Sequence, residues 1–287
     1  MAKSTGQRRS YAKRQLEAFF SNRLAVVSSV IVLLFIFAVV FAPLLTDYPP
    51  EAPNLRNRTA PPSRDHLFGT DKLGRDLFSR VLYGGRVSIL IGVVSAIGGA
   101  TIGVILGSIA GFFGGKIDAV LVRVSELFLT FPSMLLNLIL VALIGRGVFN
   151  LIFVFIITGW MTPFRLIRGR FLTLREETYV LVCRAFGVPE ITIMFRHILP
   201  NAISPIIVAI TINTANYILS EAGMSFIGLG VPSSVPSWGN ILNAAKSLEV
   251  VNNYWWMWFF PGLVISLFVL AVNFVGDGLR DVFDPKG

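Results

Sequence analysis

The sequence has little charge and very little cysteine or histidine. Only 14% of its 287 residues are Asp, Glu, Lys or Arg, whereas 54% are hydrophobic. This balance excludes an intrinsically disordered chain and disfavours an ordinary water-soluble globule. The single cysteine, Cys183, excludes an intrachain disulfide, and with only His66 and His197 as histidines a His/Cys zinc site is not expected.

Long apolar runs are the main feature that is present. Mean hydropathy is +0.71, as in integral membrane proteins. A membrane-spanning helix needs about 20 mostly apolar residues, so this length has room for about six. We therefore predict an all-α integral membrane protein with six transmembrane helices. The predicted spans are Leu24–Leu45, Val87–Phe113, Leu121–Ile144, Val148–Phe164, Ile198–Leu219 and Trp256–Phe274. Pro132 and Pro163 are expected to kink their helices.

The distribution of charge predicts how these spans are oriented. Most of the 25 lysines and arginines fall in segments that are cytoplasmic if the N-terminus is cytoplasmic. The predicted organisation begins with a cytoplasmic tail or interfacial helix over 1–23 and a first transmembrane helix over 24–45. A proline-rich extracytoplasmic loop over 46–86 follows. The transmembrane domain covers 87–276 and includes a polar cytoplasmic segment at 165–197, and a cytoplasmic tail covers 277–287.

Glycines recur at every fourth position of the second predicted span: Gly99, Gly103, Gly107, Gly111 and Gly115. They fall on one face of a helix, where another helix can approach closely. The same stretch is not a phosphate-binding loop. Ala110 and Ile117 stand where that motif requires Gly and Ser or Thr, so ATP binding by this motif is excluded.

The polar segment after the fourth span contains signals for a short amphipathic helix. Thr173 with Glu176 forms a capping box, which predicts a helix start, and Gly187 predicts its end. Four residues between them have helical spacing on one face: Tyr179, Val182, Cys183 and Phe186. Spacing alone leaves two interpretations open. This stripe packs on the chain's own spans or the membrane surface, or it docks into a groove of a partner protein.

Polar residues in the fifth span form a second candidate site. Asn213, Asn216 and Ser220 share one helical face, and Glu221 follows them. Polar groups at membrane depth face the bundle interior or a water-filled cavity. We therefore expect these four residues either to line a translocation path or to form hydrogen bonds between helices.

The segment that holds the amphipathic helix resembles the coupling loop of permease subunits in binding-protein-dependent ABC importers. The matching residues are Tyr179, Arg184, Ala185, Gly187 and the run Arg196–Asn201. The chain departs from the family's Glu-Ala-Ala stretch, because Leu181, Val182 and Cys183 stand there. Four further stretches resemble C-type permeases of dipeptide, oligopeptide and nickel importers: Phe68–Ser88, Arg123–Ser133, Gly228–Asn240 and Gly276–Asp281.

The resemblance implies a permease subunit, without catalysis of its own, in the bacterial cytoplasmic (inner) membrane with both termini in the cytoplasm. Implied partners are a second homologous permease, two cytoplasmic ATPases that bind ATP and Mg, an extracytoplasmic substrate-binding protein and membrane lipid. This chain would bind no cofactor, metal or nucleic acid itself. Peptides are the expected cargo, while nickel chelates, glutathione and other small solutes stay open. The implied coupling residues are Tyr179, Val182, Cys183, Phe186 and Gly187.

Three other classes of protein are weaker interpretations of the same sequence. A self-contained secondary transporter usually carries ionisable residues near the bilayer centre, and often an internal repeat. Here the charged residues of the spans, such as Glu126 and Glu221, lie near span ends, and no repeat is evident. A membrane-embedded zinc enzyme would need a His-Glu-x-x-His motif, and a nucleic-acid binder would gather its basic residues on one face.

Overall fold

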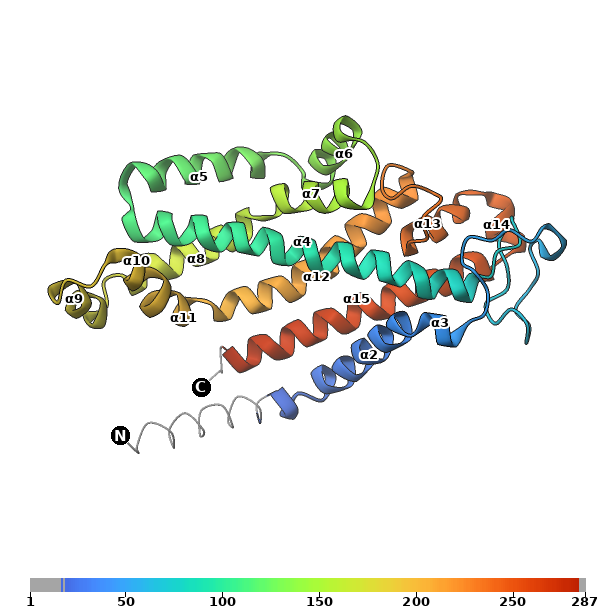
Figure 1. Ribbon diagram of the computed structural model, residues 1–287, viewed down its shortest axis with the longest axis horizontal. Coiled ribbons are helices and arrows are strands. Elements are labelled where there is room, and N and C mark those ends of the chain that lie inside the picture. The colour runs from blue at the N-terminus through green and yellow to red at the C-terminus, as the bar shows by residue number, and fades with distance from the viewer. Residues whose placement is uncertain (1–16, 18, 284–287) are drawn as a thin grey trace.

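The computed structural model describes Glu17 and residues 19–283, and within this part every regular element is a helix (Figure 1). This confirms the predicted all-α class. The α-helices are α2 (Arg23–Val40), α3 (Ala42–Leu45), α4 (Leu77–Phe113), α5 (Gly115–Thr130), α6 (Ser133–Ile144), α7 (Val148–Gly159), α8 (Met161–Leu174), α9 (Thr178–Ala185), α10 (Glu190–Thr192), α11 (Leu199–Ala202), α12 (Ser204–Ile227), α13 (Trp238–Leu242), α14 (Leu248–Asn253) and α15 (Trp256–Phe283). A π-helical turn, η2 (Ile193–Ile198), joins α10 to α11, and short 3₁₀ turns cover Leu55–Asn57 and Asn243–Lys246.

Between four and six segments of the described chain could cross a membrane. Four are long and apolar enough on their own: α2, α4, the combined stretch Val148–Leu174, and α15. Two bent pairs would raise the number to six: α5 with α6, bent by 90°, and Glu190–Ala202 with α12, bent by 63°. The chain is thus a multi-pass membrane protein. The number of transmembrane helices, six, stays a prediction.

Proline has different effects at the two predicted kinks. Pro132 lies in the break between α5 and α6, and the 90° bend there confirms the expected kink. Pro163 lies in the first turn of α8, where a missing N–H is tolerated, and Val148–Leu174 counts as one candidate span. The predicted third span is therefore two helices at a right angle.

Two helices extend further than their apolar runs predicted. Helix α4 begins at Leu77, well before Val87, because the backbone N–H of Ser79 donates to the Asp76 side chain at 2.7 Å and caps the helix. Helix α15 continues past Phe274 to Phe283. The first part of the expected tail is therefore helical, while residues 284–287 and most of 1–23 lie outside the described residues.

The glycine face of α4 packs against α8, as its spacing predicted. A Cβ on Gly103 would lie 2.6 Å from the carbonyl oxygen of Trp160, and one on Gly107 would lie 2.7 Å from that of Phe164. Gly99 and Gly111 meet the same neighbouring stretch. Gly115 does not belong to this face, because α4 ends at Phe113 and nothing approaches Gly115 within 4 Å.

The capping-box prediction at Thr173 was wrong. Helix α8 continues through Thr173 to Leu174, and α9 begins only at Thr178. Phe164, Ile167 and Phe171 of α8 are fully buried, so tertiary packing keeps this stretch helical. Gly187 does end the next helix, as expected. It has φ of 72°, and the N–H of Val188 donates to the carbonyl of Cys183 at 3.0 Å, which is a Schellman motif.

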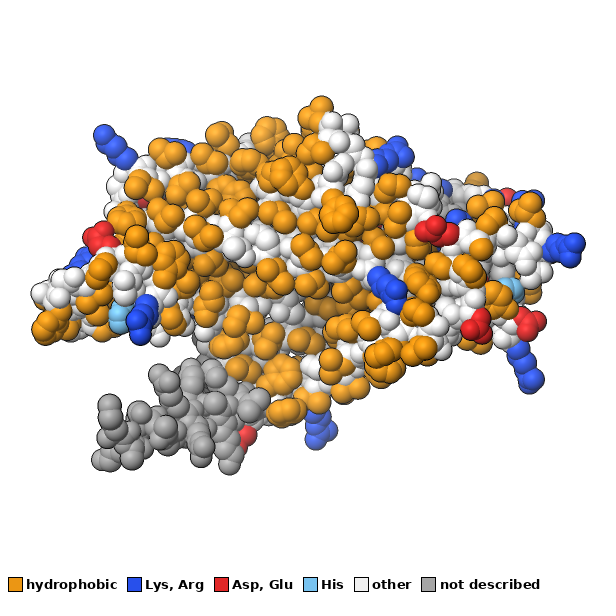
Figure 2. Space-filling model, viewed as in Figure 1, with side chains coloured by type: hydrophobic (Ala, Val, Ile, Leu, Met, Phe, Trp, Pro, Cys, Tyr) orange, Lys and Arg blue, Asp and Glu red, His pale blue; other side chains and the backbone are white. Residues whose placement is uncertain are grey.

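The long helices lie side by side, and two sets of short elements gather at opposite ends of them (Figure 1). One end carries α9, α10 and α11 beside the last turns of α15. The other end carries residues 46–76 together with α13 and α14. On the face shown in Figure 2, hydrophobic side chains cover the middle of the molecule and most charged side chains lie toward the ends. This distribution fits an apolar bilayer around the middle.

Candidate functional site

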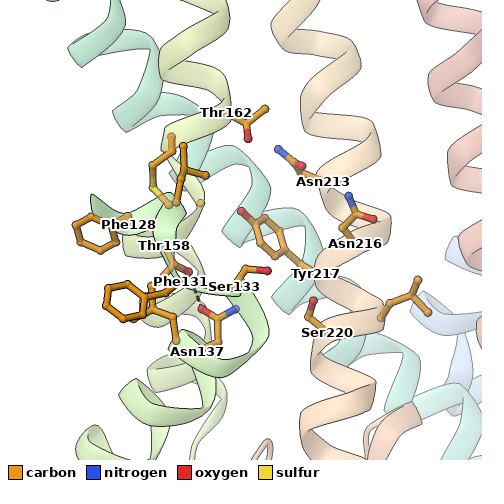
Figure 3. A pocket seen from close by; sticks show the side chains of 15 residues that line it. Phe128, Phe131, Ser133, Asn137, Thr158, Thr162, Asn213, Asn216, Tyr217 and Ser220 are labelled. Atoms are coloured by element: carbon orange, nitrogen blue, oxygen red, sulfur yellow. Dashed lines mark hydrogen bonds between the residues drawn. The ribbon is translucent and has the colours of Figure 1, made fainter. Parts of the chain in front are cut away.

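A cavity of about 490 Å³ lies among α5, α6, α7, α8 and α12, next to the bend at Pro132 (Figure 3). Its apolar walls include Phe128 and Phe131. Its polar side chains are Ser133, Asn137, Thr158, Thr162, Asn213, Asn216, Tyr217 and Ser220. All of these are uncharged groups that can accept a hydrogen bond, and each also carries an N–H or O–H donor. The cavity therefore offers hydrogen-bond donors and acceptors without a charged group among the lining residues that the structure describes.

Helix α12 contributes three of the four residues predicted for a path. Asn213, Asn216 and Ser220 line the cavity together, on the side opposite Asn137 and Thr158 (Figure 3). Neighbouring residues of a helix point about 100° apart. Glu221, one residue after Ser220, therefore points away from the cavity and is not among its lining residues. Glu221 was predicted, with these three residues, either to line a path or to form hydrogen bonds between helices, and it does not line this cavity.

The Glu221 side chain is instead 0% exposed and enclosed by three serine hydroxyls. Ser88 of α4, Ser225 of α12 and Ser237 before α13 each donate to its carboxyl oxygens at 2.8 Å. Ser88 also accepts the backbone N–H of Trp238 at 3.2 Å. Glu221 thus fastens the segment before α13 to α4 and α12, which is a structural role.

Several residues of the cavity were missed by the sequence analysis. Thr158 donates to Asn137 at 2.7 Å, which joins α7 to α6 across the cavity wall (Figure 3). Both residues are polar interruptions of apolar runs, and this is the signal that singled out Asn213. The same search applied to every span would have found Asn137 and Thr158.

A second cavity of about 560 Å³ lies between α8, α11, α12 and the end of α15. It shares Thr162 and Asn213 with the first cavity, so the two adjoin along α8 and α12. Its lining residues include Arg170 and Arg280. No sequence signal singled out these two arginines, because they lie 110 residues apart on different helices.

The predicted apolar stripe of α9 is divided between two environments. Tyr179 and Cys183 pack against a core that contains Val180, Ile193 and Phe171. Val182 is 47% exposed and Phe186 is 83% exposed. Leu181 and Ile191 add to this exposed apolar surface. One side of α9 is thus anchored in the molecule, while the other is available to a partner.

Three arginines connect α9 and α8 with neighbouring helices. Arg184 lies over the ring of Phe112 at 5.1 Å, and Arg175 donates to the carbonyl of Gly111 at 3.2 Å. Arg168 of α8 forms a two-pronged pair with Asp118 of α5, with one bond of 2.6 Å. Helix α9 is thus linked to α4 through Arg184, and to α8 through the shared core that contains Ile167 and Phe171.

At the opposite end, a buried pair organises the loop over 46–76. His66 Nδ1 lies 2.9 Å from Asp76 Oδ1, and the same carboxyl group caps α4. Lys72 pairs with Glu249 before α15 at 2.7 Å. Among the described residues, no group of three or more His, Cys, Asp or Glu side chains is arranged to hold a metal ion.

Comparison with known proteins gives two family matches. The family described as binding-protein-dependent transport system inner membrane component matches residues 103–286. A second family, the N-terminal TM domain of oligopeptide transport permease C, matches residues 10–62.

Individual relatives match over almost the whole chain. The oligopeptide transport system permease protein OppC of Bacillus subtilis (strain 168) is 42% identical over 268 residues, which cover 93% of this chain and 87% of that protein. A putative peptide permease protein of Brucella suis is 42% identical over 273 residues, or 95% and 90% of the two chains. The dipeptide transport system permease protein DppC of Alkalihalophilus pseudofirmus is 40% identical over 265 residues, or 92% and 86%.

Proposed function

This chain belongs to the family of binding-protein-dependent transport system inner membrane components, and we propose that it is the permease subunit of an ABC importer of di- or oligopeptides. The observation that carries the proposal is identity of 42% over 93% of the chain with a protein named as an oligopeptide permease. The uncharged, hydrogen-bonding cavity supports peptides as cargo, since a peptide backbone presents the complementary donors and acceptors.

In this proposal the chain works with a second homologous permease, two cytoplasmic ATPases and an extracytoplasmic substrate-binding protein. ATP and Mg are bound by the ATPases, and this chain carries no catalytic group. The end with α9 and both termini face the cytoplasm. The end with residues 46–76 and α13 faces outward and receives the binding protein. The six-span arrangement of the proposal counts each bent helix pair as one crossing.

Helix α9 is the proposed contact with the ATPases. Val182 and Phe186 insert into a groove on the ATPase, which is supported by their exposure. Tyr179 and Cys183 hold α9 to the bundle, and the left-handed Gly187 sets the turn that follows. Closure of the ATPases on ATP displaces α9, and the contacts with α4 and α8 convert this displacement into a change of access across the membrane.

The proposed translocation path runs through the cavity lined by Asn213, Asn216 and Ser220. Glu221 is not part of this path and keeps its structural role. The polar side chains replace some of the water that a peptide loses inside the membrane. The spatial order of the elements supports this, because the cavity lies between the two ends that carry α9 and the 46–76 loop.

Reconstitution tests the function as a whole. The four kinds of subunit are placed in vesicles, and uptake of a radiolabelled tripeptide is measured with and without ATP inside. We expect ATP-dependent and binding-protein-dependent uptake of peptides. Uptake of a nickel chelate or glutathione in preference to any peptide would assign the importer to another cargo.

Replacing the polar face of α12 tests the path. Asn213→Leu, Asn216→Leu and Ser220→Ala together should lower peptide uptake roughly tenfold or more, since each lost hydrogen bond contributes about 1 kcal/mol. Subunit assembly, measured by co-purification, should not change. Thr211→Val is the matched control, because its hydroxyl bonds to Ile207 of the same helix and does not line the cavity. Unchanged uptake in the triple variant would refute the path.

A further inference from the structure

The second cavity differs from the first in its charge. The first cavity is lined by neutral polar groups, whereas Arg170 and Arg280 line the second. Among the residues that the structure describes, no acidic side chain lines the second cavity. The nearby acids of α15, Asp277 and Asp281, are not in its lining, and Asp281 accepts a hydrogen bond from Asn22 at 3.1 Å.

Both arginines of this cavity have free hydrogen-bonding capacity. Among the described residues, neither Arg170 nor Arg280 takes part in an ion pair or a side-chain hydrogen bond, while Arg168 and Arg175 nearby do. A guanidinium group holds a carboxylate through two parallel N–H···O bonds. Two unpaired guanidinium groups on one concave surface therefore favour an anionic ligand there.

The position of this cavity connects it with the proposed path. It adjoins the first cavity at Thr162 and Asn213, and its outer end lies at the last turns of α15, beside α11. A solute that leaves the first cavity toward the α9 end therefore passes the two arginines. Peptides carry a terminal carboxylate whatever their sequence, and this carboxylate is an anionic group that the two arginines can bind.

We infer that the second cavity is a carboxylate-binding subsite, in which Arg170 and Arg280 hold the terminal carboxylate of a peptide before its release to the cytoplasm. This inference rests on the proposed function, because it assumes a peptide on the path. The neutral first cavity accepts peptides of any charge, and the second one orients them by their carboxyl end.

An anionic phospholipid would meet the same arginines with its phosphate, but the geometry favours the peptide. The cavity wall is apolar at Leu166, Val208 and Ile212, yet its inner end is formed by Thr162 and Asn213. An acyl chain entering from the arginines would end against these polar groups, at a cost in desolvation. A peptide can form hydrogen bonds with them.

The test measures access to the cavity directly. Leu166 lines the cavity and is partly exposed, and Cys183 is the single native cysteine. In the complete transporter with Cys183→Ser and Leu166→Cys, the rate of labelling by a thiol reagent is measured with trialanine or with trialanine amide. We expect trialanine to slow labelling about two- to fivefold more than its amide does, which is the effect of a charge pair at a partly exposed site.

Arginine variants identify the groups responsible. Arg170→Gln with Arg280→Gln should abolish the difference between trialanine and its amide, while Arg170→Lys with Arg280→Lys should keep most of it. Arg165→Gln is the control, since Arg165 is an exposed arginine of α8 that does not line the cavity. If the double glutamine variant does not assemble, Arg280→Gln alone in the last turns of α15 serves the same purpose.

Each remaining outcome bears on the inference. Equal protection by trialanine and its amide, or a difference that survives in the glutamine variants, would overturn the subsite. Protection that depends on phosphatidylglycerol in the vesicles without any peptide would assign the cavity to lipid and also overturn it. Peptide uptake in the same vesicles reports the proposed function separately. Uptake without carboxylate-dependent protection contradicts the subsite alone, and absence of uptake in an assembled complex contradicts the proposed function.

Discussion

The carboxyl group of Glu221 shows how one buried polar residue joins distant parts of the chain. The three serine hydroxyls that donate to it come from α4, from α12 and from the turn before α13. A buried hydroxyl that loses its acceptor becomes an unsatisfied donor. Each such donor lowers the free energy of unfolding by about 1–3 kcal/mol. The packing of α13 against the bundle therefore depends on this one side chain.

Glu221→Leu should lower the free energy of unfolding by about 3 kcal/mol or more, because three donors lose their acceptor at once. The thermal unfolding midpoint in detergent measures this. Glu126→Leu is the control, since Glu126 pairs with Arg123 at 3.0 Å on the surface and such pairs contribute about 0–1 kcal/mol. Equal losses in the two variants would show that Glu221 has no special structural role.

The sequence could indicate that Glu221 is important but not what it contacts. Helical spacing grouped Asn213, Asn216 and Ser220 correctly, since these positions differ by three or four residues. Whether Glu221, the residue after Ser220, faces a cavity or another helix depends on which helix packs against that side of α12. Ser88 is more than 100 residues away, and no local pattern connects it to Glu221.

Helix α4 approaches α8 so closely that a side chain at its glycine positions has no space. Gly103→Val should lower the free energy of unfolding by about 1–3 kcal/mol, because its Cβ would meet backbone atoms of Trp160 and Phe164 within 2.7 Å. Gly169→Ala is the matched control, since nothing lies within 4 Å of a Cβ there. That change should be neutral or stabilising by up to about 1 kcal/mol. Thermal unfolding of both variants in detergent checks the contrast, and similar midpoints would contradict it.

Helix α9 leads to a prediction about coupling. Phe186→Ala should leave ATP hydrolysis by the assembled transporter in place but lower uptake per ATP about tenfold or more, because an anchor residue in a groove contributes about 2 kcal/mol or more. Leu33→Ala, at an exposed apolar residue in the middle of α2 and away from both ends, should have no effect. A wild-type ratio of uptake to hydrolysis in Phe186→Ala would refute the proposed contact.

Local signals predicted elements well only where local forces decide the structure. The glycine spacing predicted the α4–α8 contact because a surface without side chains favours close approach whatever the partner. Thr173 with Glu176 failed as a helix start because burial of Phe171 and its neighbours keeps α8 helical past that point. Gly187 succeeded because its left-handed conformation ends a helix by itself.

The arrangement of the whole bundle was less accessible from the sequence than its class. Apolar runs predicted a multi-pass helical protein and Pro132 predicted a kink, but the size of that kink, 90° between α5 and α6, was not predictable. This bend is what places Asn137 opposite α12 at the cavity. The number of apolar residues sets the number of candidate spans. Which helices become neighbours depends on how well their surfaces fit along their full length.

The predicted orientation places the two ends of the molecule on opposite sides of the membrane, and labelling can test it. In a Cys183→Ser background, Arg64→Cys in the 46–76 loop should react with a charged, membrane-impermeant maleimide in intact spheroplasts. Arg196→Cys, near α9, should react only after the membrane is opened. Both positions are exposed in the structure, so a difference in reactivity reports sidedness rather than burial. The Cys183→Ser parent should not react. The reverse pattern would place α9 outside the cell, where no ATP-binding subunit could reach Phe186, and would exclude α9 as the point at which ATP hydrolysis drives transport.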